Sequence, residues 1–137
     1  MTTQGGAKGY IPIEQLEFFK DLEKLSDDVW AIVTLLRIFE RDTVGKQLVR
    51  ALNSIGANLV EGDGRYSDLE SLHFFSIAKG SARETRFWLR RCEERGLMVP
   101  ELAAGFQSQL ESIMRRLSAL VSTRRKNIRS QSDPPPF

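Results

Sequence analysis

The side chains with the clearest chemical potential in this chain are arginines. Arg83, Arg86 and Arg90 are spaced i, i+3 and i+7, which places them on one face of a helix. Arg91 and Arg95 follow on a neighbouring face. Guanidinium groups bind phosphate through paired hydrogen bonds, so the pattern predicts contact with a nucleic-acid backbone. The alternative interpretation is an exposed helix face crossed by salt bridges.

A second group of cations lies toward the C-terminal end, although the formal net charge of the chain is only +2. Residues 100–137 hold six basic and three acidic residues, a net of +3, whereas residues 1–43 hold five and eight, a net of −3. Such asymmetry is typical of a chain with a nucleic acid or another acidic partner. Cations that complement a helix dipole explain any single one of them equally well. These basic residues are Arg115, Arg116, Arg124, Arg125, Lys126 and Arg129.

No residue pattern indicates catalysis or a bound metal ion. His73 is the only histidine, and no cysteine or histidine pair has the spacing of a zinc site. Glu70 and His73 have the spacing of a di-iron motif, but a di-iron bundle needs that motif twice. The glycines around Asp63 follow a predicted helix, whereas a dinucleotide-binding loop follows a strand. We therefore expect no catalytic residue, no metal and no cofactor.

Length and composition indicate one globular domain. The 137 residues are 41% hydrophobic and 28% charged, which is ordinary for globular proteins. No apolar run approaches the roughly 20 residues that a membrane-spanning helix needs. The single cysteine, Cys92, has no disulfide partner within the chain. We therefore expect a cytoplasmic protein with no membrane contact.

Hydrophobic periodicity predicts the helices that position these side chains. Their expected ranges are 13–41, 44–61, 67–95 and 100–128. In the first helix an unbroken seam with alternating spacings of four and three runs from Phe18 to Phe39. In the second, an apolar stripe begins at Val44, and Asp42 or Thr43 is expected to cap it.

The third helix has signals at both ends. Ser67 and Glu70 form a capping box, and Gly96 is expected to end the helix. Its predicted core stripe runs from Phe74 through small residues to Trp88 and Cys92. Residues 1–12 are expected to be flexible, and residues 130–137, with three consecutive prolines, to be disordered.

Four helices with short connections predict an all-α, antiparallel up-down-up-down bundle. Trp30, Phe87 and Trp88 cannot all fit one narrow seam. Leaving one such side chain exposed forfeits about 1.5–3 kcal/mol, which favours self-association through an outer face. A wider core stripe is the alternative.

The corner between the second and third helices is rich in glycine. Gly56, inside a predicted helix, suggests that another backbone passes close by, because a helical glycine costs about 0.5–1 kcal/mol relative to alanine. Gly62 is expected to end the helix, and Gly64 to form part of the turn. The remaining polar residues of the corner, expected to tie it down, are Asn58, Glu61 and Arg65.

Three segments of the chain resemble one known family. They are Gly45–Ala51, Asn53–Tyr66, and Ile77–Ser81 with Glu84–Thr85 and Trp88–Leu89, within a likeness that covers roughly residues 16–121. The family is that of the four-helix-bundle proteins found in intervening sequences of bacterial large-subunit ribosomal RNA genes. The accessory variability determinant of diversity-generating retroelements shares its fold. Val60 and Asp63 depart from the common pattern, in which alanine and an aromatic residue are frequent.

The resemblance implies a homopentameric, ring-like barrel without known catalysis. For the retroelement branch it also implies binding of RNA or DNA and association with a reverse transcriptase. We therefore expect a non-enzymatic oligomer that binds nucleic acid non-specifically through basic helix faces, as an accessory to a larger nucleic-acid machine. The alternative is a protein-interaction scaffold with no nucleic-acid role.

Overall fold

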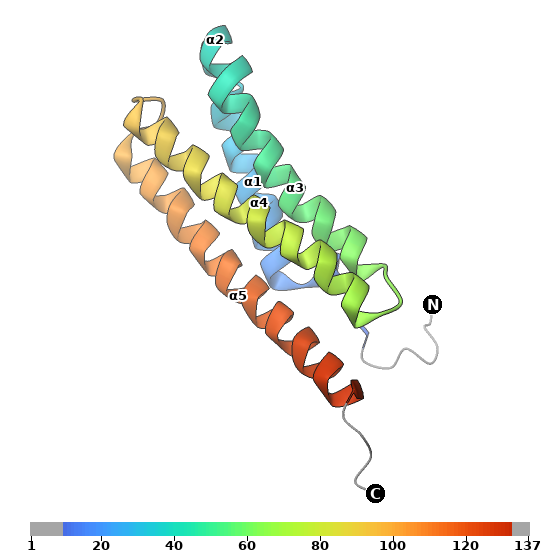
Figure 1. Cartoon of the computed structure of the whole chain (residues 1–137). Coiled ribbons are helices and arrows are strands. Elements are labelled where there is room, and N and C mark those ends of the chain that lie inside the picture. The colour runs from blue at the N-terminus through green and yellow to red at the C-terminus, as the bar shows by residue number, and fades with distance from the viewer. Residues whose placement is uncertain (1–9, 133–137) are drawn as a thin grey trace, which may run out of the picture.

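The computed structural model describes residues 10–132, and within that range every regular element is helical (Figure 1). The predicted all-α four-helix bundle is confirmed. The long helices are α1 (Glu17–Val33), α3 (Lys46–Asp63), α4 (Asp68–Glu94) and α5 (Pro100–Ser132). The shorter elements are a 3-10 turn, η1 (Ile13–Gln15), a single turn, α2 (Ile38–Glu40), and a π-helical segment, η2 (Arg41–Gly45). None of the described helices is long and apolar enough to cross a membrane.

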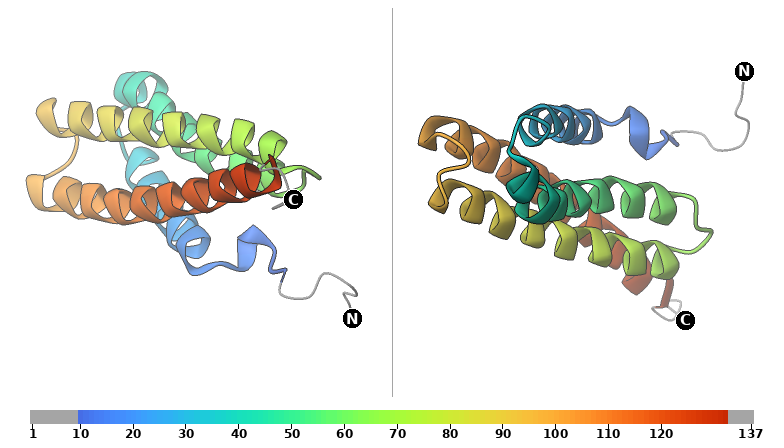
Figure 2. Two further views of the ribbon diagram at one scale, coloured as in Figure 1. Left: turned by 60° about the horizontal axis from the view of Figure 1, so that its bottom comes forward. Right: turned by 90° about the horizontal axis from the view of Figure 1, so that it is seen from above.

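The long helices surround one core. α4 packs against α3 and α5, and α1 packs against the other side of the same two helices (Figure 2). α3 and α4 are antiparallel, since Ser54 lies beside Ser81 and Arg50 lies beside Glu84. α4 and α5 are antiparallel too, and they are the two longest described helices.

The first helix ends earlier than its hydrophobic seam predicts. α1 stops at Val33, and a turn, α2 and η2 replace the expected continuation to residue 41. The register of α1 against α3 explains the difference. Leu22 lies beside Gly56 and Ser26 bonds to Asn53, and the midpoint of both pairs falls close to residue 39, where the chain must reverse.

This reversal exposes the end of the predicted seam. Phe39 is 74% exposed, and Leu35 and Ile38 beside it are exposed as well. The expected cap at Asp42 or Thr43 does not form, because helical backbone continues through η2 into α3. The hydroxyl of Thr43 instead donates to the carbonyl oxygen of Phe39.

The core face of α4 is turned slightly from the predicted stripe. Phe75 and Leu89 are fully buried, whereas Phe74 and Trp88 are only partly buried. The small middle of the stripe is buried as expected, and there the hydroxyls of Ser54 and Ser81 approach to 2.8 Å. Small side chains thus let α3 and α4 pack closely. The predicted stripe from Val44 in η2 to Leu59 in α3 is buried.

The ends of α4 form as their sequence signals predict. The hydroxyl of Ser67 accepts a hydrogen bond from the backbone N–H of Glu70. At the other end Gly96 has a φ of 73°, and Leu97 N–H donates to the carbonyl of Cys92, which closes a Schellman motif.

The two ends of the chain are covered only in part. α5 continues to residue 132, past the predicted end at 128 and into the segment expected to be disordered. The rest of that segment and most of the expected flexible N-terminus lie outside the described residues.

Candidate nucleic-acid interface

The predicted arginine stripe lies on the solvent side of α4, along its seam with α5. Arg83, Arg86 and Arg90 line an open groove of about 950 Å³ between the two helices. Within the described part of the chain, the guanidinium groups of Arg83 and Arg86 are exposed and have no partner. Arg90 lies 5.6 Å from the ring centroid of Phe87 and 3.9 Å from a carboxylate oxygen of Glu94. The stripe therefore presents two unpaired cations and a third that is weakly engaged.

The opposite wall of the groove comes from α5. Gln107 donates from its side-chain amide to the carbonyl oxygen of Arg86, at 3.1 Å, and so fixes the spacing of the two helices. Ser108, Leu110, Glu111 and Met114 complete this wall. The groove thus has a mixed lining, with cations on α4 and neutral side chains along most of α5.

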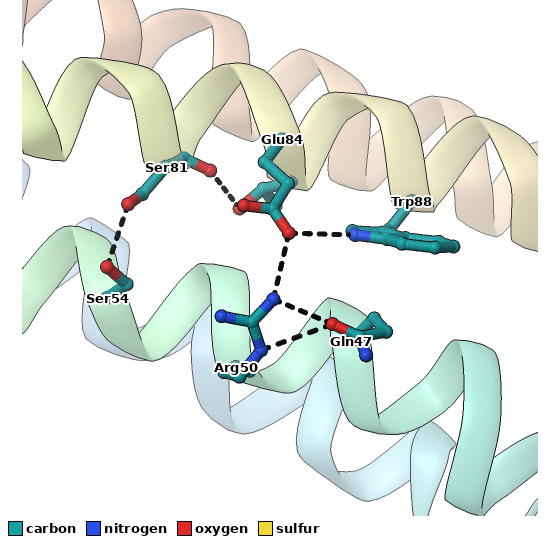
Figure 3. A network of polar contacts seen from close by, with 7 residues as sticks. Gln47, Arg50, Ser54, Ser81, Glu84 and Trp88 are labelled. Atoms are coloured by element: carbon teal, nitrogen blue, oxygen red, sulfur yellow. Dashed lines mark hydrogen bonds and ion pairs between the residues drawn. The ribbon is translucent and has the colours of Figure 1, made fainter.

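Two carboxylates also line the groove, and neighbouring cations compensate both. Glu84 accepts hydrogen bonds from Arg50 of α3, at 3.2 Å, and from the indole of Trp88, at 3.1 Å (Figure 3). Glu111 accepts from Arg115, at 3.1 Å. The groove therefore keeps the positive character that its three arginines give it.

Ion pairs engage four of the other predicted arginines, namely Arg91, Arg115, Arg116 and Arg124. Arg91 contacts Glu94 at 2.6 Å, and Arg115 contacts Glu111. Arg116 reaches from α5 to Asp21 of α1, at 2.7 Å, and links the two helices. For Arg91, Arg115 and Arg116, the alternative interpretation of a helix face crossed by salt bridges therefore applies. Arg95, the residue after α4, is exposed.

The basic end of α5 is a separate surface. Arg124 is only 24% exposed, pairs with Asp68 at 3.5 Å and lies over the ring of Phe75, so it joins the end of α5 to the start of α4. Arg125 and Lys126 are exposed and unpaired within residues 10–132, and Arg129 is exposed. Arg125 follows Met114, the last groove-lining residue of α5, by 11 residues, or roughly 16 Å of helix. One subunit therefore carries two basic clusters.

The glycines of the corner have different surroundings. A Cβ on Gly62 would lie 2.8 Å from the ring of Phe75, so this glycine allows the close packing of α3 on α4. Gly62 lies inside α3, and the helix ends one residue later, at Asp63, with Gly64 as its C-cap. Gly56 faces Phe19 and Leu22 at ordinary contact distances, so the close backbone expected there is absent.

The polar residues of the corner make two separate sets of contacts. Arg65 donates to Glu61 one turn earlier, and its guanidinium lies 4.6 Å from the ring centroid of Phe74. Asn58 instead donates to the carbonyl and hydroxyl oxygens of Ser54. A structural role for Asn58, Glu61 and Arg65 stays a prediction.

The side chains best suited to catalysis or metal binding lie apart. His73 packs edge-on against Phe74 near the start of α4. Cys92 is buried near the end of α4, and this burial raises the pKa of the Cys92 thiol. Among residues 10–132, no three histidine, cysteine, aspartate or glutamate side chains form a group that could hold a metal ion.

Sequence reasoning missed the role of Phe87 in the groove, having treated it as part of an outer apolar face. The helical spacing indicates that Phe87 shares the face of the arginines, since it lies four residues after Arg83 and three before Arg90. Gln107 gives no such local signal. Its contribution depends on the register between α4 and α5.

These observations define a four-helix-bundle protein with an open, basic groove along its longest helix pair. The sequence model of a family described as 23S rRNA-intervening sequence protein matches residues 14–119, more than half of the chain. The chain belongs to this family.

The fold is shared with solved structures. One of them is the crystal structure of a protein of unknown function from the S23 ribosomal protein family of Bacteroides thetaiotaomicron VPI-5482. Its TM-score is 0.69 at 21% sequence identity, over 76% of this chain and 97% of that one. At this identity the likeness shows the fold alone. No curated protein matches the chain.

Proposed function

We propose that this protein is a non-enzymatic RNA-binding bundle that contacts the nucleic-acid backbone with little sequence preference. The observation that carries the proposal is the pair of exposed guanidinium groups, Arg83 and Arg86, that have no partner in the described part of the chain. Phosphate oxygens are the ligands that such groups bind best. The family description, which refers to ribosomal RNA, supports RNA as the ligand.

The proposal extends to assembly and setting. It comprises an up-down-up-down subunit in a ring-like homo-oligomer, a pentamer by family resemblance, in the cytoplasm. Exposed apolar side chains where the chain passes from α1 to α3 support self-association; they are Trp30, Leu35, Ile38 and Phe39. Repeating a modest basic patch in a ring raises overall avidity by about 10²–10⁴. Such a ring would serve a larger nucleic-acid machine, such as a retroelement reverse transcriptase.

A salt titration tests the RNA-binding role. Retention of RNA on a filter should be strong at low salt and fall steeply as salt rises. The double variant Arg83→Gln/Arg86→Gln should reduce the slope of log affinity against log salt by about 1.4, since each phosphate contact on a single strand contributes about 0.7. Failure of the wild-type protein to retain RNA or DNA at low salt would contradict the proposal.

The scaffold alternative predicts a different pattern. Trp30 lines an apolar hollow of about 420 Å³ with Val33 and Val49, a surface suited to a protein partner. If the protein were purely a scaffold, changing Arg125 and Lys126 would leave its function intact, whereas changing Trp30 would abolish it.

A further inference from the structure

One aromatic ring lies within the arginine stripe of the α4–α5 groove. Phe87 is 43% exposed and lines the same groove as Arg83, Arg86 and Arg90. Helical spacing places it one turn from both Arg83 and Arg90. Backbone contacts alone do not require an exposed ring at this place.

We propose that this groove binds a single-stranded segment of nucleic acid, with an unpaired base stacked on Phe87 and neighbouring phosphates on Arg83 and Arg86. The inference rests on the proposed function and adds the form of the ligand. RNA and DNA strands share this chemistry, and the experiment below compares them.

Chemistry favours a single strand over a duplex. The bases of a duplex are stacked on one another, so a protein ring has access to a base face only where the strand is unpaired. Positively charged grooves with exposed aromatic rings are the common solution for sequence-tolerant binding of single strands. The Arg90 guanidinium lies over one face of the Phe87 ring, 5.6 Å from its centroid, so the base is placed on the opposite face, with the cation on the other side of the ring.

The length of the groove suits a short segment. Arg83 and Arg90 are seven residues apart on α4, which is roughly 10 Å along the helix axis. The two carboxylates of the groove are held by Arg50 and Arg115, so phosphates meet compensated charges. The basic end of α5 has no exposed aromatic side chain among residues 121–130 and lacks this combination.

The experiment compares three probes by fluorescence anisotropy at low salt: a labelled oligouridylate, a deoxyuridine strand of equal length, and duplex RNA. Phe87→Leu keeps an apolar side chain and removes the aromatic face. It should weaken binding of the single strands about 5- to 150-fold, which corresponds to the loss of about 1–3 kcal/mol from one stacked base. Binding of the duplex should not change. A preference for RNA over DNA would assign a contact to the 2′-hydroxyl.

Two charge variants provide the matched control. Arg83→Gln/Arg86→Gln and Arg125→Gln/Lys126→Gln each remove two positive charges, from the groove and from the end of α5. The first should weaken single-strand binding more than the second. Unchanged single-strand affinity in Phe87→Leu, or equal loss for strand and duplex, would overturn the inference while leaving general RNA binding intact. Wild-type protein that binds none of the probes would overturn the proposed function itself.

The molecular mass in solution distinguishes a loss of ligand binding from a loss of self-association. Light scattering of Phe87→Leu should give the wild-type mass, because Phe87 is assigned to the ligand. A variant that loses both its assembled mass and its binding would overturn the inference in favour of a subunit contact.

Discussion

At the scale of single residues, two glycines of α3 test how closely the helices pack. Gly62→Ala places a methyl group 2.8 Å from the fully buried ring of Phe75, so the ring or the helix must shift. We expect the free energy of unfolding to fall by about 1–3 kcal/mol. Gly56→Ala is the matched control, since its methyl group meets Leu22 at 3.7 Å. That change should stabilise the protein by about 0.5–1 kcal/mol.

Urea unfolding of the two variants measures both effects. The signs of the two changes should be opposite. A Gly62→Ala protein as stable as wild type would show that α3 and α4 pack less closely around Gly62 than their contacts indicate.

A hydrogen bond near the start of the described chain predicts a titration. Tyr10 donates to the carboxylate of Asp63 at 2.7 Å, and this bond raises the pKa of the phenol from 10.0 to about 12. Because the folded pKa is the higher one, the neutral phenol stabilises the fold fully below pH 10. That contribution is lost as the pH rises through 12.

Ultraviolet absorbance follows the ionisation of Tyr10. Tyr66 is the only other tyrosine, so a Tyr66→Phe background isolates the signal. The phenol should titrate near pH 12 in that background and nearer to 10.0 after the further change Asp63→Asn. The same midpoint in both proteins would exclude the bond as the cause.

At the scale of helices, periodicity predicts faces but not registers. The stripe of α3 and the caps of α4 are local properties, and they form as the sequence predicts. The end of α1 depends on how α1 aligns with α3, so a seam that continues to Phe39 could not reveal the break at Val33.

The candidate site shows the same contrast between local spacing, which the sequence reveals, and contacts between helices, which it does not. The spacing of Arg83, Arg86 and Arg90 predicts their common face. The pairing of Arg116 with Asp21 joins residues that are 95 positions apart, and no local pattern indicates it. The sequence therefore predicts two groups of basic residues, and ion pairs reduce each of them to a smaller accessible cluster.

The start of α4 gives a test at this scale. The Ser67 hydroxyl accepts from the N–H of Glu70 at 3.1 Å, which satisfies one of the free donors of the first turn. Ser67→Ala should lower the free energy of unfolding by about 1 kcal/mol, and Ser67→Asp should retain most of the wild-type stability. Thermal unfolding by circular dichroism measures both. Equal loss in the two variants would show that the cap does not stabilise the helix.

At the scale of the whole molecule, the exposed surface separates into chemically distinct regions. The α4–α5 groove and the end of α5 carry cations, whereas the α1–α3 corner carries apolar side chains. We name as the apolar corner Trp30, Leu35, Ile38 and Phe39, which are 58%, 83%, 69% and 74% exposed. A surface of this kind is typical of a protein interface. In the proposed homo-oligomer, subunits would therefore meet at the apolar corner and keep their basic grooves accessible.

This arrangement predicts that the double variant Leu35→Ser/Phe39→Ser assembles poorly. Each side chain would lose about 1.5–3 kcal/mol of burial in the oligomer. Neither is packed in the core of the subunit, so the helical circular dichroism signal should remain. Light scattering should show a mass well below that of the wild type. Tyr66→Ser/Leu69→Ser is the matched control, because it removes two other exposed apolar side chains, at the α3–α4 corner. A wild-type mass for Leu35→Ser/Phe39→Ser, or an equal loss of mass in the control variant, would place the subunit contact elsewhere.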